Sequence, residues 1–333
     1  MPRLRRETIE GGLYHVYNRF ARGEEVFADP GEAIGFIDRL HETKARDGFS
    51  VFAWALMSNH FHVALRTSAV PLSRTMHYLQ NGFSRSFNRR WRRTGPLWQS
   101  RYKAKLIHDQ EYLVRIVTYI HLNPVRAGLV EQPADYVFSG HRELMGKIRS
   151  PLCDVDEALM VFGETTKAAR RSYASDLKQA MKEDGLGDSV DALPWWKRDR
   201  QLEVDPDLPY VDVLGRSTGL ERKSLRADQF IALACECLGV DPADVASRRQ
   251  DSATARLRRL IASCGVERWD QRAGHLAALL KKHSVVVSRW VNEAGKIRSD
   301  DEEFAADLDS LDRALSTKAI ERLEELRTAE RQS

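Results

Sequence analysis

The stretch FSVFAWALMSNHFHVALR, residues 49–66, decides the fold of the N-terminal part of this 333-residue chain. Residues 49–57 are almost continuously apolar, Ser58-Asn59 is a turn signal, and a second apolar run resumes at His60. Two short apolar runs joined by two turn-forming residues are typical of a β-hairpin. The hairpin places His60 and His62 at the start of its second strand.

The segments on either side of the hairpin extend this pattern into a small domain. Apolar residues recur at alternate positions in some segments and at helical spacing in others, and the segments follow the order β-α-β-β-α-β-α. This order predicts an α+β fold, a ferredoxin-like antiparallel sheet with helices packed on one face. The other expected strands are 13–19 and 101–107, and the expected helices are 31–46, 72–91 and 109–121, the last with Asp109 as its N-cap.

The two histidines of the hairpin form a candidate metal site. Residues i and i+2 of a strand point to the same face, so His60 and His62 project together while Phe61 points into the core. Two imidazoles on a rigid strand can hold a divalent metal. The pattern alone is weak, because paired histidines on a strand are more often structural or solvated.

Tyr119 and Asn123 strengthen the metal hypothesis because they supply a nucleophile and a third ligand. They are four residues apart and share a helix face. The Asn123 carbonyl oxygen suits Mg²⁺ or Mn²⁺, although Pro124 places Asn123 near the end of the helix. Tyr112 is a rival nucleophile on the same helix, but it lies eleven residues before Asn123, too far to share the metal.

Other residues with suitable chemistry are expected to have packing roles. Tyr14, Tyr17 and Tyr102 lie on predicted strands, His15 is expected to be a sheet residue, and His121 is expected off the metal face.

Three ordered motifs carry a resemblance to a known family. They are MSNHFHV at 57–63, LWQSRYK at 97–103 and YIHLNPVRAGLV at 119–130. Residues 8–145 resemble the single-tyrosine HUH transposases, in particular the REP-associated tyrosine transposase branch.

The resemblance implies a complete chemistry for the domain. His60 and His62 would be metal ligands with Asn123 as the third, and Tyr119 the nucleophile, with Mg²⁺ or Mn²⁺ as cofactor. The family cleaves single-stranded DNA beside hairpins of palindromic elements, leaving a 5′-phosphotyrosine and a free 3′-OH, and religation reverses the step. Transesterification conserves bond energy, so no ATP is needed, and the sequence carries no Walker motif.

Charge alternates in four blocks along the chain. Counting Lys and Arg against Asp and Glu, residues 1–150 carry +9, 151–221 carry −6, 222–298 carry +7 and 299–333 carry −6. Two basic blocks suggest two nucleic-acid-binding modules, although ordinary surface charge is an alternative. The expected phosphate-contacting residues of the first block are Arg85, Arg89, Arg92 and Arg93, with Phe87 and Trp91 between them, and Arg101, Lys103 and Lys105 on a strand.

The C-terminal part is predicted to be all-α. Residues 273–290 resemble the DNA-binding domain of bacterial replication initiators, which implies a helix-turn-helix presenting Ser284, Ser288 and Arg289 to duplex DNA. The segment 282–286 departs from the usual pattern, which leaves base readout open, and a plain helical bundle is the alternative. The expected boundaries are a catalytic domain at 1–148, a helical segment and linker at 149–221, a DNA-binding module at 222–298 and an acidic helical tail at 299–333.

The remaining composition suits a reduced, cytoplasmic, nucleoid-associated protein. The four cysteines form no paired CxxC spacing, and no run of about 18 apolar residues exists to span a membrane. The expected partner is DNA, as single-stranded hairpin ends and as duplex, and a homodimer is compatible with the sequence. Two other functions stay open, a catalytically silent DNA-binding regulator derived from a transposase and a structural zinc protein, the latter disfavoured because no closed four-ligand set appears.

Overall fold

A computed structural model describes residues 10–107, 109–184, 222–223 and 225–332. The chain forms two compact units. Most of the described residues up to 184 belong to the first, and those from 222 onward belong to the second together with Ala45–Asp47 and Ala69–Arg74. The linker expected around Trp195-Trp196 lies outside the described residues.

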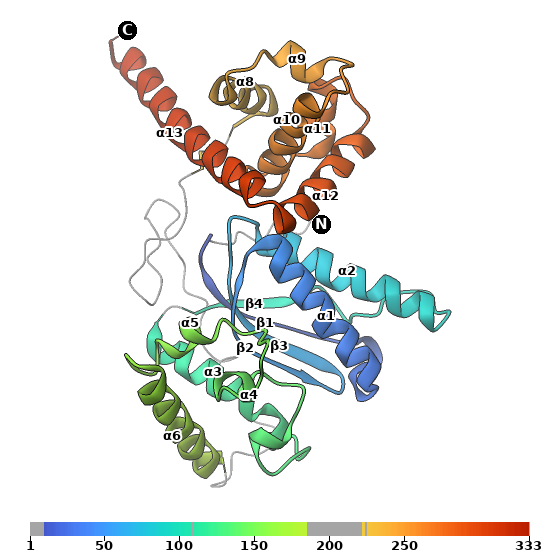
Figure 1. The fold of residues 1–333 in the computed structure, drawn as a ribbon, viewed down its shortest axis with the longest axis vertical. Helices are drawn as coiled ribbons and strands as arrows, with labels where there is room; N and C mark the ends of the chain where they lie inside the picture. Colours follow the sequence, from blue (N-terminus) through green and yellow to red (C-terminus); the bar gives the residue numbers. More distant parts are fainter. Residues whose placement is uncertain (1–9, 108, 185–221, 224, 333) are drawn as a thin grey trace. The chain divides into compact units, whose positions relative to one another are not determined.

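The first unit has the predicted order of strands and helices, with small shifts at the boundaries (Figure 1). Several short 3-10 helices connect these elements. The main elements are β1 Leu13–Arg19, α1 Pro30–Asp47, β2 Ser50–Met57, β3 His60–Arg66, α2 Leu72–Arg90, β4 Lys103–Leu106 and α3 Gln110–Arg126, followed by α4 His141–Leu144, α5 Val155–Leu159 and α6 Thr166–Asp184.

The four strands form one antiparallel sheet in the order β2-β3-β1-β4. In this register Tyr17 lies opposite His62, and Ala55 lies opposite His62 on the other side. Lys103 in turn lies opposite Tyr17. Residues directly opposite each other in an antiparallel sheet share a face, so these side chains project from the same side.

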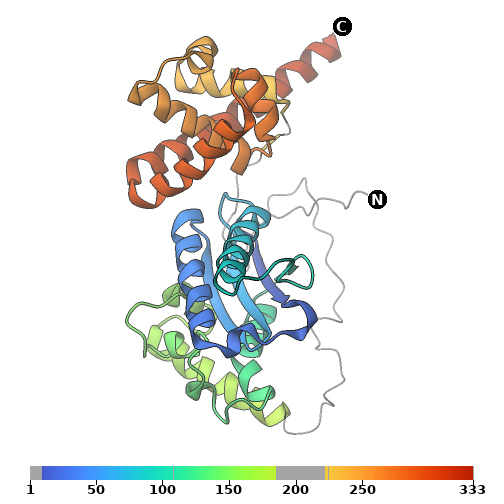
Figure 2. The same cartoon turned by 90° about the vertical axis from the view of Figure 1, so that its right-hand side faces the viewer.

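Helices cover both faces of the sheet (Figures 1 and 2). The Phe61 ring contacts Phe36 of α1, and Phe36 contacts Phe83 of α2, so both helices pack on the Phe61 face as expected. Helix α3 lies on the opposite face, where Tyr119 contacts His62, and α6 packs against α3. The α+β class is therefore confirmed, while the placement of all helices on one face holds only for α1 and α2.

Local sequence signals explain where the helices around the sheet begin and end. Asp29 caps α1, with Pro30 following it, and Gly48 ends the helix in the left-handed conformation at φ 71°. The Asp109 carboxylate accepts from the Tyr112 backbone N–H at 2.6 Å, which confirms the predicted cap of α3. Helix α3 does not end near Asn123, because Pro124 is accommodated inside it and the Ala127 N–H donates to the Asn123 carbonyl.

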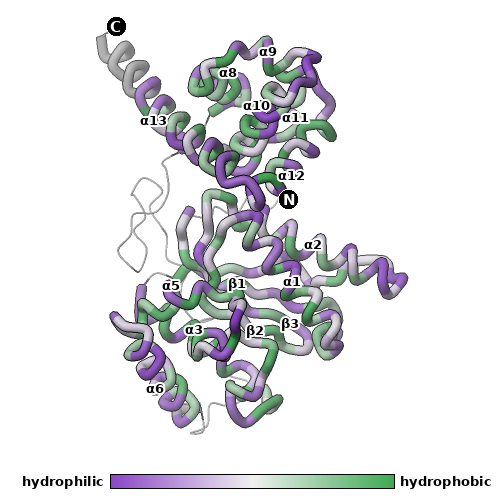
Figure 3. The backbone as a smooth tube through the Cα atoms, viewed as in Figure 1, coloured by the Kyte–Doolittle hydropathy of each residue, from purple (hydrophilic) through white to green (hydrophobic). Residues whose placement is uncertain are grey.

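The distribution of apolar residues follows the sheet (Figure 3). Seven of the eight residues of β2 are buried, as are the five central residues of β3. Figure 3 colours these strands largely as hydrophobic, whereas α6 is hydrophilic along much of its length. A hairpin buried on both faces is held rigidly, which suits strands that position a site.

The second unit is all-α, as predicted. Its apolar core includes Phe230, Leu260 and Phe304. None of the described helices in either unit is long and apolar enough to cross a membrane. The elements are α8 Ala227–Leu238, α9 Pro242–Ala246, α10 Ser252–Ser263 with a π-helical extension Cys264–Arg268, α11 Ala273–Leu279, α12 Ser284–Asp300 and α13 Glu302–Gln332.

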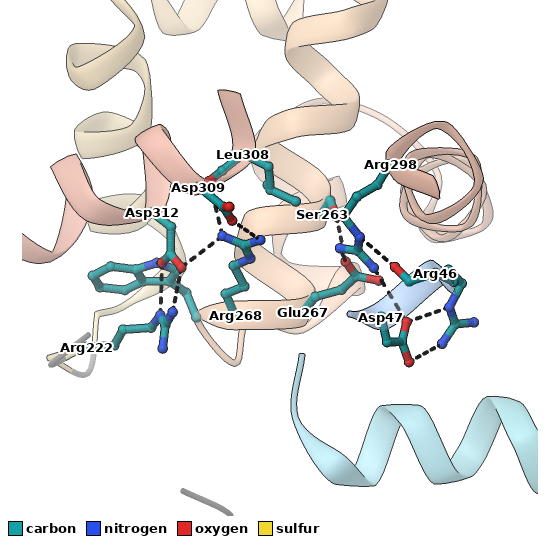
Figure 4. Close-up of polar contacts among 11 residues, drawn as sticks. Arg46, Asp47, Arg222, Ser263, Glu267, Arg268, Arg298, Leu308, Asp309 and Asp312 are labelled. Carbon is teal, nitrogen blue, oxygen red and sulfur yellow. Dashed lines mark hydrogen bonds and ion pairs between the residues drawn. The ribbon is translucent and has the colours of Figure 1, made fainter. Parts of the chain in front are cut away.

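A buried ion-pair network joins α13 to the rest of the second unit (Figure 4). The Asp312 carboxylate is 1% exposed and accepts from Arg222, from Arg268 at 3.1 Å and from the Trp269 indole at 2.8 Å. Burial alone would raise the pKa of Asp312, but the hydrogen bond and charge of Arg222, with Arg268, hold it below its usual value. Within the acidic segment 299–333, helix α13 therefore packs against the rest of this unit along the part whose side chains are described.

Candidate active site

His60 and His62 lie side by side at the start of β3, as the hairpin predicts. Their ring centroids are 5.0 Å apart, and the two ring planes are nearly perpendicular at 87°. His62 is buried at 3% exposure, and His60 is half-buried. Phe61 between them is fully buried in the opposite layer. The spacing allows both imidazoles to reach a common ion, since metal–nitrogen bonds are about 2.0–2.1 Å long.

Each histidine of this pair has a hydrogen-bond partner at its Nδ1 atom. His60 Nδ1 lies 2.7 Å from the side-chain oxygen of Asn59. His62 Nδ1 lies 2.9 Å from Nε2 of His15. With the Asn59 oxygen as the acceptor, His60 donates from Nδ1, which leaves the lone pair of its neutral ring on Nε2.

His15 and Tyr17 of β1 belong to this site, contrary to the expectation that they only pack in the sheet. The Tyr17 ring stacks on His62 at 5.6 Å, and the His15 ring stacks on His62 at 5.1 Å. Burial, with a smaller contribution from the charge of Lys105, lowers the pKa of His15 to about 3, so this imidazole is neutral. The alternation of β1 predicts that both residues share a face of the sheet. Their contact with His62 depends in addition on the pairing of β1 with β3, which the sequence pattern did not predict.

Tyr119 lies over the histidines on α3 and is half-buried. Its ring centroid is 5.7 Å from that of His62 and 6.1 Å from that of His15. The Arg126 guanidinium stands 5.1 Å from the Tyr119 ring centroid, in a cation–π contact. Tyr112, the rival on the same helix, is instead buried at 6% exposure. Of these two tyrosines, Tyr119 is the one placed beside the histidines.

Asn123 lies one helical turn after Tyr119 and is half-buried. Its side-chain Nδ2 is buried and makes no hydrogen bond to any described residue. Because the two ends of an amide exchange places by a half-turn, this orphaned position can equally hold the oxygen. A buried amide that awaits a partner fits the role of an oxygen ligand.

The residues present thus fit a divalent cation bound by two imidazoles and one amide. Among the described residues, no three His, Cys, Asp or Glu side chains form a group that could hold a metal. A cation at this site would therefore have few protein ligands and would leave coordination positions for phosphate oxygens.

Two of the expected DNA-contacting lysines share the face of the histidines. Lys105 lies opposite His15 and Lys103 opposite Tyr17 in the β1–β4 register. The Lys103 ammonium is 6.0 Å from the Tyr17 ring centroid. Arg101 is exposed and lies two residues before β4 begins. The site is therefore flanked by positive charge, with a half-exposed aromatic ring between.

Comparison with known proteins supports the assignment of this domain. Residues 9–123 match the family model described as "Transposase IS200 like". This segment contains His60, His62, Tyr119 and Asn123. We call residues 9–123 the IS200-like domain after this match.

Two individual proteins are also similar to this chain. The chain is 28% identical to a protein of Haemophilus influenzae described as a REP-associated tyrosine transposase, over 44% of this chain and 90% of that protein. It also resembles a solved structure titled as a REP-associated tyrosine transposase bound to a REP hairpin, at 21% identity, with a TM-score of 0.38, over 46% of this chain and 93% of the other.

The arginines at the end of α2 in the IS200-like domain divide into two groups. Arg93 forms two hydrogen bonds with Glu24, at 2.6 and 2.7 Å, and Arg90 pairs with buried Glu32. The other three, Arg85, Arg89 and Arg92, are exposed and form no ion pair with a described residue. Phe87 is in the core, whereas Trp91 is 52% exposed and donates to Glu32.

A buried cluster behind α3 was not predicted. The Tyr173 hydroxyl of α6 lies 2.8 Å from Nδ1 of His121 and 2.7 Å from Nδ1 of His141. Burial, with the nearby His141, lowers the pKa of His121 well below its usual value, and burial lowers that of His141 to about 4. Two neutral imidazoles can each share the hydroxyl, one accepting and one donating, so this tyrosine ties α6 to α3.

The predicted DNA-reading residues of the second unit lie on the exposed side of α12. Ser284, Ser288 and Arg289 are exposed, and α11 packs against α12. His283 caps α12 through Nδ1, which accepts from the Val285 N–H at 3.3 Å. Helix α12 continues to Asp300, beyond the segment 273–290 that carries the resemblance.

Proposed function

We propose that this protein cleaves and rejoins single-stranded DNA at hairpin-bearing palindromic elements, using Tyr119 as a covalent nucleophile. The observation that carries the proposal is the contact between the Tyr119 and His62 rings, 5.7 Å apart within one chain. The match of residues 9–123 to a transposase family model supports it, as does the likeness to a protein described as a REP-associated tyrosine transposase.

The chemistry is a transesterification at a DNA phosphate. The Tyr119 phenol oxygen forms a bond to phosphorus, and the bond from phosphorus to the 3′-oxygen of the preceding nucleotide breaks. The 3′-oxygen leaves as a hydroxyl after gaining a proton, and the phenol loses one. The phosphate ester is conserved on the tyrosine, so the reverse attack by a 3′-OH rejoins DNA.

Three side chains would hold Mg²⁺ or Mn²⁺ for this reaction, namely His60, His62 and Asn123. The cation supplies positive charge that polarises the phosphate and offsets its developing negative charge. Arg126, beside the Tyr119 ring, adds a second positive group near the same phosphate. Since one chain supplies all of these groups, a second copy is not needed to complete the site.

The positive side chains around the site suggest a path for the strand. Lys103 and Lys105 share the histidine face, and Tyr17 offers a half-exposed ring on which a base can stack. Arg101, Arg85, Arg89 and Arg92 extend the charge beyond the site. Arg93 is a weaker phosphate contact than expected, because it is already paired with Glu24.

A second candidate function, duplex DNA binding, concerns the second unit. It is favoured by the exposed row Ser284, Ser288 and Arg289 on α12, packed against α11 in the order of a helix-turn-helix. This unit would recruit the enzyme to its element while the first unit acts on the unpaired strand.

The test is incubation of the full chain with hairpin-bearing single strands and Mg²⁺ or Mn²⁺, followed by denaturing electrophoresis. We expect a covalent protein–DNA band that depends on the cation and is lost in Tyr119→Phe. Tyr112→Phe serves as the matched control, because that ring is buried on the same helix and its substitution should leave the band in place. Absence of cleavage with hairpins from the source genome would favour a silent DNA-binding regulator instead.

A further inference from the structure

His15 occupies an unusual position for a polar side chain. It is fully buried in the sheet at 0% exposure, on the central strand β1, next to the strand that carries the two histidines of the site. Its Nε2 lies 2.9 Å from Nδ1 of His62, and the two rings stack at 5.1 Å with an angle of 28° between their planes. Burial of an imidazole nitrogen costs free energy unless it is hydrogen-bonded, and the contact with His62 offsets this cost at Nε2 of His15.

We propose that His15 is a positioning residue that fixes the tautomer and orientation of His62 for metal binding. In this arrangement His62 donates its Nδ1–H to Nε2 of His15, so the lone pair of His62 resides on Nε2. The proposal rests on the proposed function, since it assumes that His62 is a metal ligand.

The contact of His60 has the same sense as the one proposed for His62. Its Nδ1 lies 2.7 Å from the Asn59 side-chain oxygen, and with this oxygen as the acceptor His60 presents Nε2. With the His15 contact in the same sense, both histidines of the pair present the same nitrogen. Partners of this kind orient the ligand ring and raise its basicity, and their loss typically weakens metal binding roughly 10- to 100-fold.

The competing explanation is that His15 only fills space in the core. A packing role predicts that an apolar side chain of similar size serves equally well. A positioning role predicts that a hydrogen-bond acceptor is required at this place. Leucine and glutamine therefore separate the two explanations, because glutamine offers an oxygen acceptor while leucine offers none.

The first measurement reads the tautomer directly and needs no metal. In long-range ¹H–¹⁵N spectra of the full chain labelled at histidine nitrogens, the His62 signals, assigned by comparison with His62→Ala, should show a proton on Nδ1. In His15→Leu the Nδ1-protonated form should no longer dominate, and in His15→Gln it should return. A wild-type His62 protonated at Nε2 would overturn the proposal.

The second measurement is Mn²⁺ affinity, followed by the loss of the free Mn²⁺ electron paramagnetic resonance signal. We expect His15→Leu to bind Mn²⁺ roughly 10- to 100-fold more weakly, and His15→Gln to recover most of the loss. Val16→Ala is the matched control, since it removes buried volume from the neighbouring position of β1, on the other face, and should leave affinity unchanged.

His62→Ala separates failure of this inference from failure of the proposed function. If the wild type binds no Mn²⁺, or His62→Ala binds as well as the wild type, the metal site itself is wrong. If His62→Ala abolishes binding while His15→Leu and wild type bind equally, the site stands and the role of His15 is refuted. If His15→Leu does not fold, the tautomer of His62 in the wild type and the Mn²⁺ affinity of His15→Gln still test the role of His15.

Discussion

At the scale of single residues, two neighbours of Tyr119 characterise the site, the His62 ring and the Arg126 guanidinium. Tyr119 is half-buried between His62 and Arg126, whereas Tyr112 is in the core. Tyr17 of β1 is another tyrosine whose ring contacts His62. Tyr119 also has the Arg126 guanidinium beside it, and we expect this positive charge to affect the rate at which Tyr119 reacts.

Arg126→Ala should slow formation of the covalent adduct by roughly five- to tenfold, because losing about 1 kcal/mol or slightly more of charge stabilisation at the reacting phosphate has this effect on the rate. The loss should appear in the rate of adduct formation in single-turnover assays, with the melting temperature unchanged because Arg126 is exposed. Arg115→Ala, an exposed arginine earlier on α3, is the control and should react at the wild-type rate. Equal rates for both variants would remove Arg126 from the reaction.

At the scale of elements, α3 is held from two sides, by the sheet and by α6. Tyr173 of α6 bonds to His121, which lies two residues after Tyr119 on α3. The segment 149–184, which the sequence predicted to be separate from the catalytic domain, therefore helps to hold α3, the helix that carries Tyr119.

Tyr173→Phe should destabilise the first unit by about 2–4 kcal/mol, because it leaves two buried imidazole nitrogens without their partner. Chemical denaturation followed by circular dichroism measures this change. Lys178→Ala, at an exposed position of the same helix, should stay within about 0.5 kcal/mol of the wild type. A Tyr173→Phe variant as stable as the wild type would show that the cluster does not hold the helices together.

The network at Asp312 makes a pH-dependent contribution to the second unit. Because the pKa of this carboxyl is lowered in the folded state, its stabilisation is complete above the ordinary aspartate value of about 3.9 and is lost as pH falls through the folded pKa. We expect Asp312→Asn to be less stable by about 3–5 kcal/mol at neutral pH, since two buried arginines lose their shared partner. The gap between variant and wild type, measured by denaturation, should narrow below about pH 4; a gap that is constant with pH would contradict this account.

The elements were predictable from the sequence because their signals are local. Strand β1 follows the period-2 pattern, hairpin β2–β3 is marked by two apolar runs around a turn signal, and the Asp109 cap needs only its own neighbours. The surroundings of His62 were not predictable to the same depth, because His15 reaches it only through the strand order β2-β3-β1-β4, which no local pattern encodes. At Pro124 a local signal was misleading. Residues before a proline tend not to be helical, but α3 continues through Pro124 to Arg126.

The arginines at the C-terminal end of α2 show why phosphate contacts could not be predicted from composition alone. Five arginines within nine residues suggest phosphate binding, yet Arg90 and Arg93 are engaged by Glu32 and Glu24, which lie about 60 and 70 residues earlier. Composition reports how much positive charge a segment has, but tertiary pairing decides how much of it is available to DNA.

At the scale of the whole molecule, the two units divide the expected DNA contacts. The first carries the proposed site for an unpaired strand, and the second carries the exposed face of α12. Since each unit is compact with a core of its own, substitutions in one should leave the chemistry of the other intact.

Arg289→Ala should weaken duplex binding by about 1–3 kcal/mol, roughly 5- to 150-fold, while cleavage of a short single strand is unchanged. Fluorescence anisotropy with duplexes from the element, at several salt concentrations, measures the first quantity. Arg226→Ala, an exposed arginine of the same unit paired with Asp228, is the control. Equal duplex affinity in Arg289→Ala and wild type would argue against α12 as a recognition helix.

The most direct test of the central claim is to locate the DNA on the protein. Trypsin places the three relevant tyrosine sites on separate peptides, with Tyr119 on residues 116–126, Tyr112 on 106–115, and Tyr17 together with Tyr14 on 7–19. After reaction of the full chain with a hairpin-bearing strand and nuclease trimming, mass spectrometry should find a nucleotide phosphate on the 116–126 peptide at Tyr119. A nucleotide on the 7–19 or 106–115 peptide instead, with 116–126 unmodified, would contradict the assignment of Tyr119 as the nucleophile.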